Sequence, residues 1–548
     1  MLRLSEKQKV GNMSKLLKYY HTLKYLKPEQ IKYRIYYIGR DKFRKLKDFK
    51  YPLFLPSKSI RLSLERSIES FPSFYEKEGK YCFDFLNLSY CFDKIDWNFS
   101  KHGKLWAYNL NYFNFLFQKD MSREKGLDLI NKFIDDIESN KEGLEPYPIS
   151  LRGINWIKFL TYHRIEDKKI DDSLFAQYMI LSDNLEYHVL GNHILENGFS
   201  LLFGAYYFND ENLYKLAEDI IKRELEEEIL DDGAHFELSL MYHQLILFRV
   251  LDAFNLVKNN PKIFGSLKDL LEDKAKKMLS WLNEMTFRCG DIPLLNDSAL
   301  NIAPNTKDLN DYAKRLGIVF SKRGVLKESG YRKFTENDWE MVFDVGNIGP
   351  DYIPGHAHSD TFSFVLYVKN RPFIVDTGIS TYENNERRFI ERSTAAHNTV
   401  KIGDFEQSEV WSSFRVARRA KIVSLKEEKD FIEASHDGYE KIGFLHKRRF
   451  ENFKNKMIIT DFIENVRNVR KGLDIISYLH FHPSVKVILR NNIIKTDLSN
   501  IKIEGAEKIE IKDYFYAEGY NKLKKAKLAV IFFKKECKII FTFNFNSK

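Results

Sequence analysis

Apolar residues recur at intervals of three and four along the first half of the chain, from about Leu105 to Leu316. The pattern is clearest in "LDLINKFIDDIESN", "LYKLAEDIIKRELEEEIL" and "LKDLLEDKAKKMLSWLNEM". This spacing is typical of amphipathic helices. Polar or glycine-containing turns separate the segments, and no strand-like run falls between them. Consecutive helices of this kind predict helical hairpins stacked in a ring or a solenoid.

From about Tyr331 the period of the pattern shortens to two. Runs such as "WEMVFDVGN", "TFSFVLYVKNRPFIVDTG" and "KIIFTFNFNS" are β-rich and are separated by Gly, Asn or Asp turns. We therefore expect an all-β half, most simply a sandwich, after the helical half. Residues 51–104 contain the strand-like run "KYCFDFLNLSYCF" and are expected to form a connecting layer.

The net charge of +10 over 548 residues is unevenly distributed. Residues 1–50 contain 15 Lys or Arg and 4 Asp or Glu, a balance of +11, interleaved with tyrosines. This basic arm is either a solvated helical segment or a surface for an anionic partner, such as an acidic glycan or anionic lipid head groups. No nucleic-acid-binding motif is present, so we expect no nucleic-acid partner.

Two further features bear on location. No stretch approaches the run of about 20 apolar residues that a membrane span needs, and no secretory signal is visible, so a cytoplasmic protein is expected. A peripheral membrane contact through residues 1–50 is compatible with this. The four cysteines show no CxxC spacing and are interpreted as reduced thiols.

Candidate chemistry in the helical half centres on polar residues within apolar segments. Asn192 and His193 in "YHVLGNHILENG" interrupt an otherwise apolar helical pattern, so each needs a polar partner. The same pattern places residues 188 and 192 on one face of the helix. The upstream segment "PYPISLRGINWIKFL" carries Arg152, Asn155 and Trp156. Arginine, asparagine and tryptophan together are typical of a sugar-binding cleft, although core packing is the simpler interpretation of most aromatic residues.

In the β half, "GHAHSDTFSF" places His356, His358 and Asp360 two residues apart. If the strand starts this early, all three side chains face the same side. Asp376 and His397 follow in "RPFIVDTG" and "RSTAAHNTV". Two imidazoles and a carboxylate suit a zinc ion, so His358, Asp376 and His397 form a candidate metal site, although a lone His/Asp/His trio is weak support.

These segments together resemble the heparinase II/III family of polysaccharide lyases, which is related to the exolytic alginate lyases. The residues that carry the resemblance are "INWIKF", "LGNHILENG", "DGAHFELSLMYH", "GHAHSDTFSFVLYVKNRPFIVDTG" and "RSTAAHNTV", in this order. The resemblance implies an incomplete α/α toroid followed by an antiparallel β-sandwich. The expected division is an arm and connecting layer over residues 1–104, a toroid over 105–325 and a sandwich over 326–548.

The resemblance also implies the reaction, β-elimination on a glycan that contains uronic acid. Asn192 and His193 match the residues that neutralise the substrate carboxylate, and Tyr242 matches the tyrosine that acts as acid and sometimes as base. His356 matches a histidine that serves as the alternative base. The resemblance implies that His358, Asp376 and His397 bind a metal ion, with zinc as a structural ion.

Arg388 and Arg392, just ahead of His397, are further candidates for binding the substrate carboxylate, beside Arg152, Asn155 and Trp156. The expected partner is an acidic polysaccharide or oligosaccharide. The alternative function is a glycan-binding or glycan-modifying protein of a polysaccharide biosynthesis pathway that lacks lyase activity.

Overall fold

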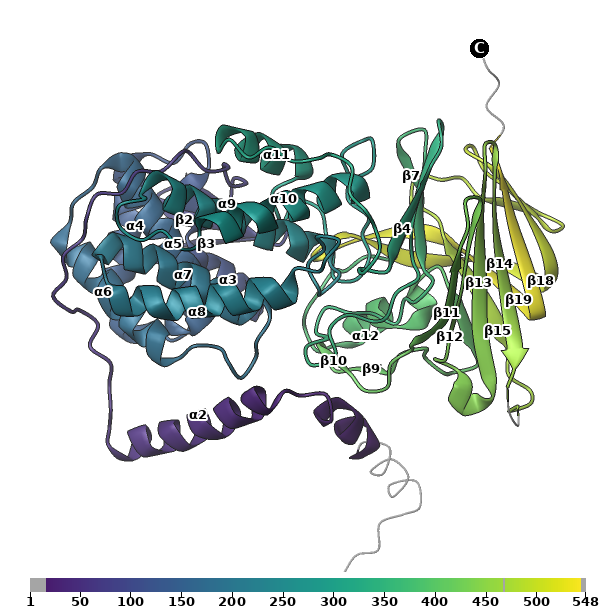
Figure 1. The fold of residues 1–548 in the computed structure, drawn as a ribbon, viewed down its shortest axis with the longest axis horizontal. Helices are drawn as coiled ribbons and strands as arrows, with labels where there is room; N and C mark the ends of the chain where they lie inside the picture. Colours follow the sequence, from purple (N-terminus) through teal and green to yellow (C-terminus); the bar gives the residue numbers. More distant parts are fainter. Residues whose placement is uncertain (1–15, 467–468, 544–548) are drawn as a thin grey trace, which may run out of the picture.

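The structure, a computed structural model, describes residues 16–466 and 469–543. A helical half and a β half lie side by side, as Figure 1 shows, with the helices in purple to teal and the strands mostly in green to yellow. This confirms the expected fold class, a helical toroid followed by antiparallel sheets.

The helical half is built from α3 (Lys104–Tyr112), α4 (Arg123–Asp135), α5 (Pro146–His163), α6 (Lys168–Asp183), α7 (Asn192–Phe208), α8 (Glu211–Glu228), α9 (Leu240–Asn259), α10 (Lys268–Met285) and α11 (Thr306–Arg315). Several begin where a polar side chain caps free backbone N–H groups, such as Asp167 before α6 and Asp210 before α8. The tryptophans Trp106, Trp156 and Trp281 are fully buried and belong to one core shared by the helices.

Within the described residues, α9 is long and apolar enough to cross a membrane by length and composition alone, with a mean hydropathy of 1.2. However, 83% of that window is buried inside the protein. The helix is therefore placed as a core helix of the toroid, and its apolar residues pack against neighbouring helices.

Two large sheets and a small two-stranded sheet of β9 (Val410–Trp411) and β10 (Arg415–Val416) form the β half, and their strands pair antiparallel. The smaller of the two large sheets contains β4 (Tyr331–Thr335), β5 (Trp339–Asp344), β6 (Phe364–Val368) and β7 (Arg371–Ile374). The larger contains β8 (Val400–Ile402), β11 (Ile422–Glu427), β12 (Phe431–His436), β13 (Phe444–Phe453), β14 (Lys456–Asn465), β15 (Ile475–His480), β16 (Ile488–Arg490), β17 (Ile493–Lys495), β18 (Asn500–Gly519) and β19 (Lys522–Thr542). Apolar residues from both, including Phe343, Phe364 and Phe541, share one core.

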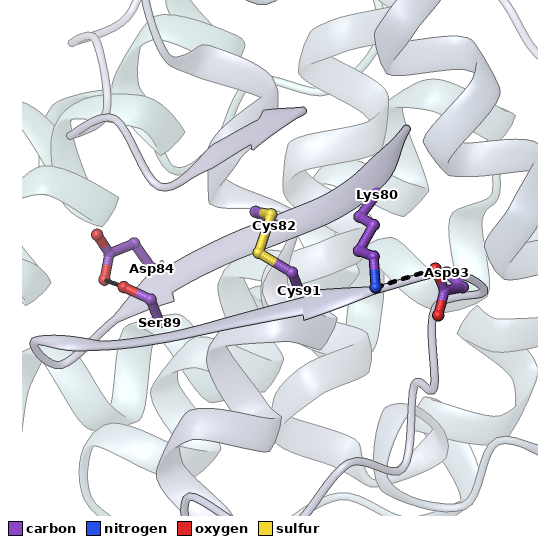
Figure 2. Close-up of a disulfide and its surroundings, with 6 residues drawn as sticks. All are labelled: Lys80, Cys82, Asp84, Ser89, Cys91 and Asp93. Atoms are coloured by element: carbon purple, nitrogen blue, oxygen red, sulfur yellow. Dashed lines mark hydrogen bonds and ion pairs between the residues drawn. A yellow bond between two sulfur atoms is a disulfide. The ribbon is translucent and has the colours of Figure 1, made fainter. Parts of the chain in front are cut away.

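A three-stranded sheet of β1 (Phe74–Lys77), β2 (Lys80–Phe85) and β3 (Leu88–Phe92) forms the connecting layer and packs on the toroid core. Cys82 and Cys91 lie directly opposite each other on β2 and β3 and form a disulfide, shown in Figure 2. The prediction that all four cysteines are reduced thiols was therefore wrong for this pair. The hairpin register, which spacing in the sequence does not reveal, brings the two sulfur atoms together; Cys289 and Cys537 are free.

The basic arm contains α2 (Pro28–Leu46), which lies along the lower edge of the molecule in Figure 1. The part of the arm before residue 16 lies outside the described residues. Ahead of α2, the arm reaches the β half: the indole N–H of Trp411 donates to the Thr22 hydroxyl over 3.0 Å. The guanidinium of Arg419 lies 3.8 Å from the ring centre of Tyr25. The arm therefore contacts both halves of the protein.

The two halves meet in a small apolar cluster that contains Met241 of α9, Ala299 and Ala303 of the loop before α11, and Ile379 and Tyr520 of the β half. This junction fixes the start of α9 against the loop after β7 and the turn between β18 and β19. The candidate catalytic residues lie around it.

Candidate active site

Asn192 and His193 are the first two residues of α7. Gly191, which precedes them, has φ of 59°, and a Cβ atom there would lie 3.1 Å from a carboxylate oxygen of Glu237. Glycine therefore allows the chain to turn sharply into the helix. The expectation that His188 shares a helical face with Asn192 was wrong, because α7 begins only at Asn192. Instead, both polar residues stand at a helix N-terminus, where free N–H groups and the helix dipole favour an anion.

Tyr242 stands in the first turn of α9. The Ser239 hydroxyl caps this helix by accepting from the Tyr242 backbone N–H, and it donates to the backbone oxygen of Asp297 over 2.7 Å. The Ser298 hydroxyl accepts from the backbone N–H of Leu240 over 3.0 Å. The buried loop around residue 297 thus sets the position of Tyr242.

Asp297 is a fully buried carboxylate on which three cationic or imidazole groups converge. Its two oxygens bond separately to His356 Nδ1 and His358 Nε2, each over 2.8 Å. Arg388 binds both oxygens through its two terminal nitrogens, with 2.7 Å between Nη2 and Oδ2. Burial alone would raise the pKa of Asp297, but Arg388 and the two histidines hold it well below its usual range.

The HxH segment is a loop, because β6 begins only at Phe364. The expectation that His356, His358 and Asp360 share one side of a strand was therefore wrong. Instead, the loop allows His356 and His358 to bond to the two oxygens of the same carboxylate, that of Asp297. Asp360 is buried, and burial with Asp376 nearby raises its pKa to about 6.

The Tyr242 ring stacks on the His356 ring, with centroids 3.8 Å apart and an angle of 27° between the planes. Tyr382, from the loop after β7, donates its hydroxyl proton to the Tyr242 hydroxyl over 3.3 Å. Burial, with Tyr520, Asp297 and Glu237 nearby, raises the pKa of Tyr242 well above its ordinary value. Tyr242 therefore holds its proton at neutral pH.

A second chain of contacts links the toroid residues to the same point. The Asn192 side-chain amide donates to Glu237 over 3.1 and 3.2 Å, and Glu237 lies 3.7 Å from His356 Nε2. His193 Nδ1 pairs with Glu186 over 2.9 Å, while the side chain of His193 remains 35% exposed. Although burial works against both charges, the pair raises the pKa of His193 and lowers that of Glu186. The structure thus links Asn192, Tyr242 and His356 through contacts, and His193 follows Asn192 in the first turn of α7.

The candidate sugar-binding residues of α5 lie elsewhere, inside the toroid. Arg152 is buried and donates to the Gln177 side chain and to the backbone oxygens of Asn111 and Gly143. Asn155 is also buried and bonded internally, and Trp156 packs in the core. The interpretation of these residues as substrate contacts is corrected to a packing role, because none presents a polar atom to solvent.

Arg388 and Arg392 are buried as well. Arg388 donates to both carboxylate oxygens of Asp297. Arg392 donates to the backbone oxygens of Ala357, Ser412 and Ser413. They hold the HxH loop in place and do not face a substrate directly. Their predicted role in carboxylate binding is therefore replaced by a positioning role.

The predicted metal ligands lie close together but are engaged with neighbours. His358 and His397 have ring centroids 5.2 Å apart, and His397 Nδ1 bonds to Asp376 over 2.7 Å. His358 Nδ1 and His397 Nε2 are buried and have no hydrogen-bond partner. Among the described residues, no group of three or more His, Cys, Asp or Glu side chains is already arranged around a metal position. The two partnerless nitrogens and the nearby carboxylate are the donor types that a zinc ion takes.

Sequence reasoning missed Asp297, Tyr382 and Glu186. The signal available for Asp297 was the polar triplet Asn-Asp-Ser inside the apolar loop "IPLLNDSALN". All three residues of this triplet are buried. Tyr382 and Glu186 lie in polar segments that carry no such contrast.

Comparisons with known proteins agree with this architecture. The family model described as "Heparinase II/III-like, C-terminal" matches residues 321–544, and that of the "Heparinase II/III N-terminus" matches residues 172–327. A heparin-sulfate lyase from Bacteroides thetaiotaomicron is 23% identical over 236 residues, which are 36% of this chain and 34% of that protein. One from Bacteroides stercoris is 25% identical over 252 residues, 40% of this chain and 36% of that protein. The matched stretches span about a third of each curated relative.

Solved structures share the fold at low sequence identity. A crystal structure of heparinase III aligns with a TM-score of 0.61 and 16% identity, covering 82% of this chain and 80% of that one. A heparan sulfate lyase from Pedobacter heparinus aligns with a TM-score of 0.53 and 15% identity, covering 84% and 80%. Two adjacent family models thus cover most of the chain, from the helical half to the end of the sandwich, and the chain belongs to the heparinase II/III family.

Proposed function

We propose that this protein is a polysaccharide lyase that cleaves a uronic-acid-containing glycan by β-elimination. The observation that carries the proposal is the stacked pair of Tyr242 and His356, one from each half of the protein, beside the N-terminus of α7. An elimination needs a base, an acid and a way to neutralise a carboxylate. Each of these has a candidate at this junction.

The substrate carboxylate would lie against the start of α7. The Asn192 amide nitrogen donates to both carboxylate oxygens of Glu237 and would turn one of its hydrogens to a substrate oxygen. His193 is partly exposed, and its raised pKa favours the cationic form. Together with the helix N-terminus, these groups would stabilise the enolate-like charge that develops when C5 loses its proton.

His356 is the candidate base. The Asp297 carboxylate accepts a hydrogen bond from Nδ1–H of His356, which would leave the Nε2 lone pair available, as a base requires. Tyr242 is the candidate acid, because its raised pKa keeps the phenol protonated. In the reaction, His356 would take the C5 proton, a C4–C5 double bond would form, and the C4–O4 bond would break. The Tyr242 proton would pass to the departing O4.

A zinc ion would be structural. Its candidate ligands are the partnerless nitrogens of His358 and His397, with Asp376 beside them. The ion would cross-link the HxH loop to the segments around residues 376 and 397. The chemistry above uses none of these three side chains.

The substrate class follows from the chemistry and from the names of the relatives, which are heparin-sulfate lyases. We propose an acidic polysaccharide or oligosaccharide that contains a 4-linked uronate. A panel of such glycans, sulfated and unsulfated, should be assayed for new ultraviolet absorbance, because the unsaturated product absorbs. A protein that only binds or hydrolyses glycans would give no such signal on any member of the panel.

A further inference from the structure

One face of helix α2 contacts the toroid. The Gln30 side-chain amide donates to the backbone oxygen of Val189 over 3.0 Å, and the Tyr37 hydroxyl donates to that of Leu185. The Arg40 guanidinium donates to the backbone oxygen of Asp183. Because these contacts recur every three to seven residues, they fix which side of the helix faces inward.

The opposite face of α2 is apolar and exposed. Ile31, Ile35, Ile38 and Leu46 recur at helical spacing and are 45%, 68%, 58% and 85% exposed. We call these four residues the isoleucine stripe. Among the elements of the described residues, Figure 1 shows none below this helix. Lysines lie within the stripe or beside it, namely Lys32, Lys42 and Lys45, all of them exposed.

This arrangement is the reverse of an ordinary surface helix, which turns its apolar side inward. Single exposed apolar residues need no explanation, but an aligned set on one helix marks an interaction surface. The surrounding charge narrows the choice of partner: residues 16–50 contain eleven Lys or Arg and three Asp or Glu. A glycan or nucleic acid would satisfy the charge but would leave the isoleucines in water.

We propose that the outer face of α2 binds the surface of an anionic lipid bilayer. The isoleucine stripe would enter the boundary between head groups and acyl chains, while the flanking lysines meet anionic head groups. The helical segment before α2 exposes Leu16, Tyr20 and Leu23, which are of the same type. The arm would thus lie on the membrane surface without crossing it.

The test uses the full-length protein and vesicles of phosphatidylcholine, with or without phosphatidylglycerol, in a flotation assay without substrate. We expect flotation with the anionic vesicles only, and weaker binding as salt shortens the screening length from about 30 Å at 0.01 M to about 8 Å at 0.15 M. The double variant Ile35→Asp/Ile38→Asp should lower the bound-to-free ratio by about tenfold or more.

The matched control is Val319→Asp/Ile488→Asp, which removes two equally exposed apolar residues, 83% and 55% exposed, outside the arm. It should float like the unaltered protein. Absence of flotation with anionic vesicles, or equal flotation of the α2 variant, would overturn the proposal. It would also be overturned if the α2 variant instead converted a dimer to a monomer, since the stripe would then face a second copy. Vesicle binding requires no turnover, so failure of the lyase proposal leaves this result interpretable.

Discussion

Tyr242 and His356 stack ring on ring, with centroids 3.8 Å apart, although they come from different halves of the protein. Tyr242 enters from the first turn of α9 in the toroid, and His356 enters from the loop that leads into β6. The candidate base and the candidate acid thus come from different halves. The packing of the toroid against the sandwich therefore assembles the candidate site.

Asp297 holds His356 of this pair in place and pairs with the buried Arg388, so its replacement should lower both stability and turnover. Asp297→Asn leaves Arg388 buried without a counter-ion, which should cost about 3–5 kcal/mol of unfolding free energy. It also replaces one of the two acceptor oxygens with an amide nitrogen, which disturbs the orientation of His356 and should lower kcat about 10²–10⁴-fold. Denaturant unfolding and turnover of the folded fraction measure the two effects.

Asp461→Asn provides the matched control for this prediction. Asp461 is a second buried carboxylate, bound by His446 over 2.8 Å and by Arg448 over 2.6 Å within the sandwich. Its loss should cost similar stability but leave kcat of the folded fraction nearly unchanged. If both variants lost kcat equally, the specific role of Asp297 would be refuted.

The Glu186–His193 pair predicts the alkaline side of the pH profile. Because Glu186 raises the pKa of His193, the imidazolium should persist to higher pH than a free histidine, whose pKa is about 6.5. Activity that needs this cation should fall as pH rises through the raised pKa. In Glu186→Gln the alkaline limb of kcat/KM should move to lower pH, whereas surface Glu218→Gln should leave it in place. An unmoved limb in Glu186→Gln would contradict the electrostatic role.

The same pair predicts the pH dependence of stability with a definite sign. A raised histidine pKa contributes stability that is complete below the unfolded-state value and is lost as pH rises through the folded-state value. The lowered pKa of Glu186 contributes stability above its unfolded-state value, which is lost as pH falls. The difference in stability between the unaltered protein and Glu186→Gln should therefore be largest between these limits and shrink on either side.

The metal proposal predicts one zinc ion per chain by elemental analysis. A chelator should lower the Tm of the unaltered protein, because a structural metal contributes its binding free energy to folding. In His397→Ala the Tm should start lower and respond little to the chelator. Metal-free protein whose Tm is indifferent to the chelator would rule out the structural ion.

The Cys82–Cys91 disulfide predicts the thiol count. Titration of unreduced protein in denaturant should find two thiols, from Cys289 and Cys537, and four after reduction. A titration that finds four thiols without reductant would contradict the disulfide. The cytoplasmic location stays a prediction, and fractionation should test it, because disulfides are typical of oxidising compartments.

The sequence predicted the architecture because the change of period near Tyr331 reports directly on helices and strands. It also singled out Asn192, since a polar residue in an apolar helix needs a partner, whereas Tyr242 was singled out by the family resemblance. It failed for Arg152 and Trp156, because the same residue types build a buried network and a sugar cleft. It missed Asp297, whose partners lie 59 to 91 residues away along the chain, so only the folded structure joins them.

The proposed elimination depends most directly on the Tyr242 hydroxyl as proton donor. Turnover of Tyr242→Phe should be measured by the ultraviolet absorbance of the unsaturated product, on a glycan that the unaltered protein cleaves. We expect kcat to fall by at least about 10²–10⁴-fold with the Tm unchanged. Tyr178→Phe, at a buried tyrosine of the toroid core, should keep its kcat. Full lyase activity in Tyr242→Phe would contradict the account.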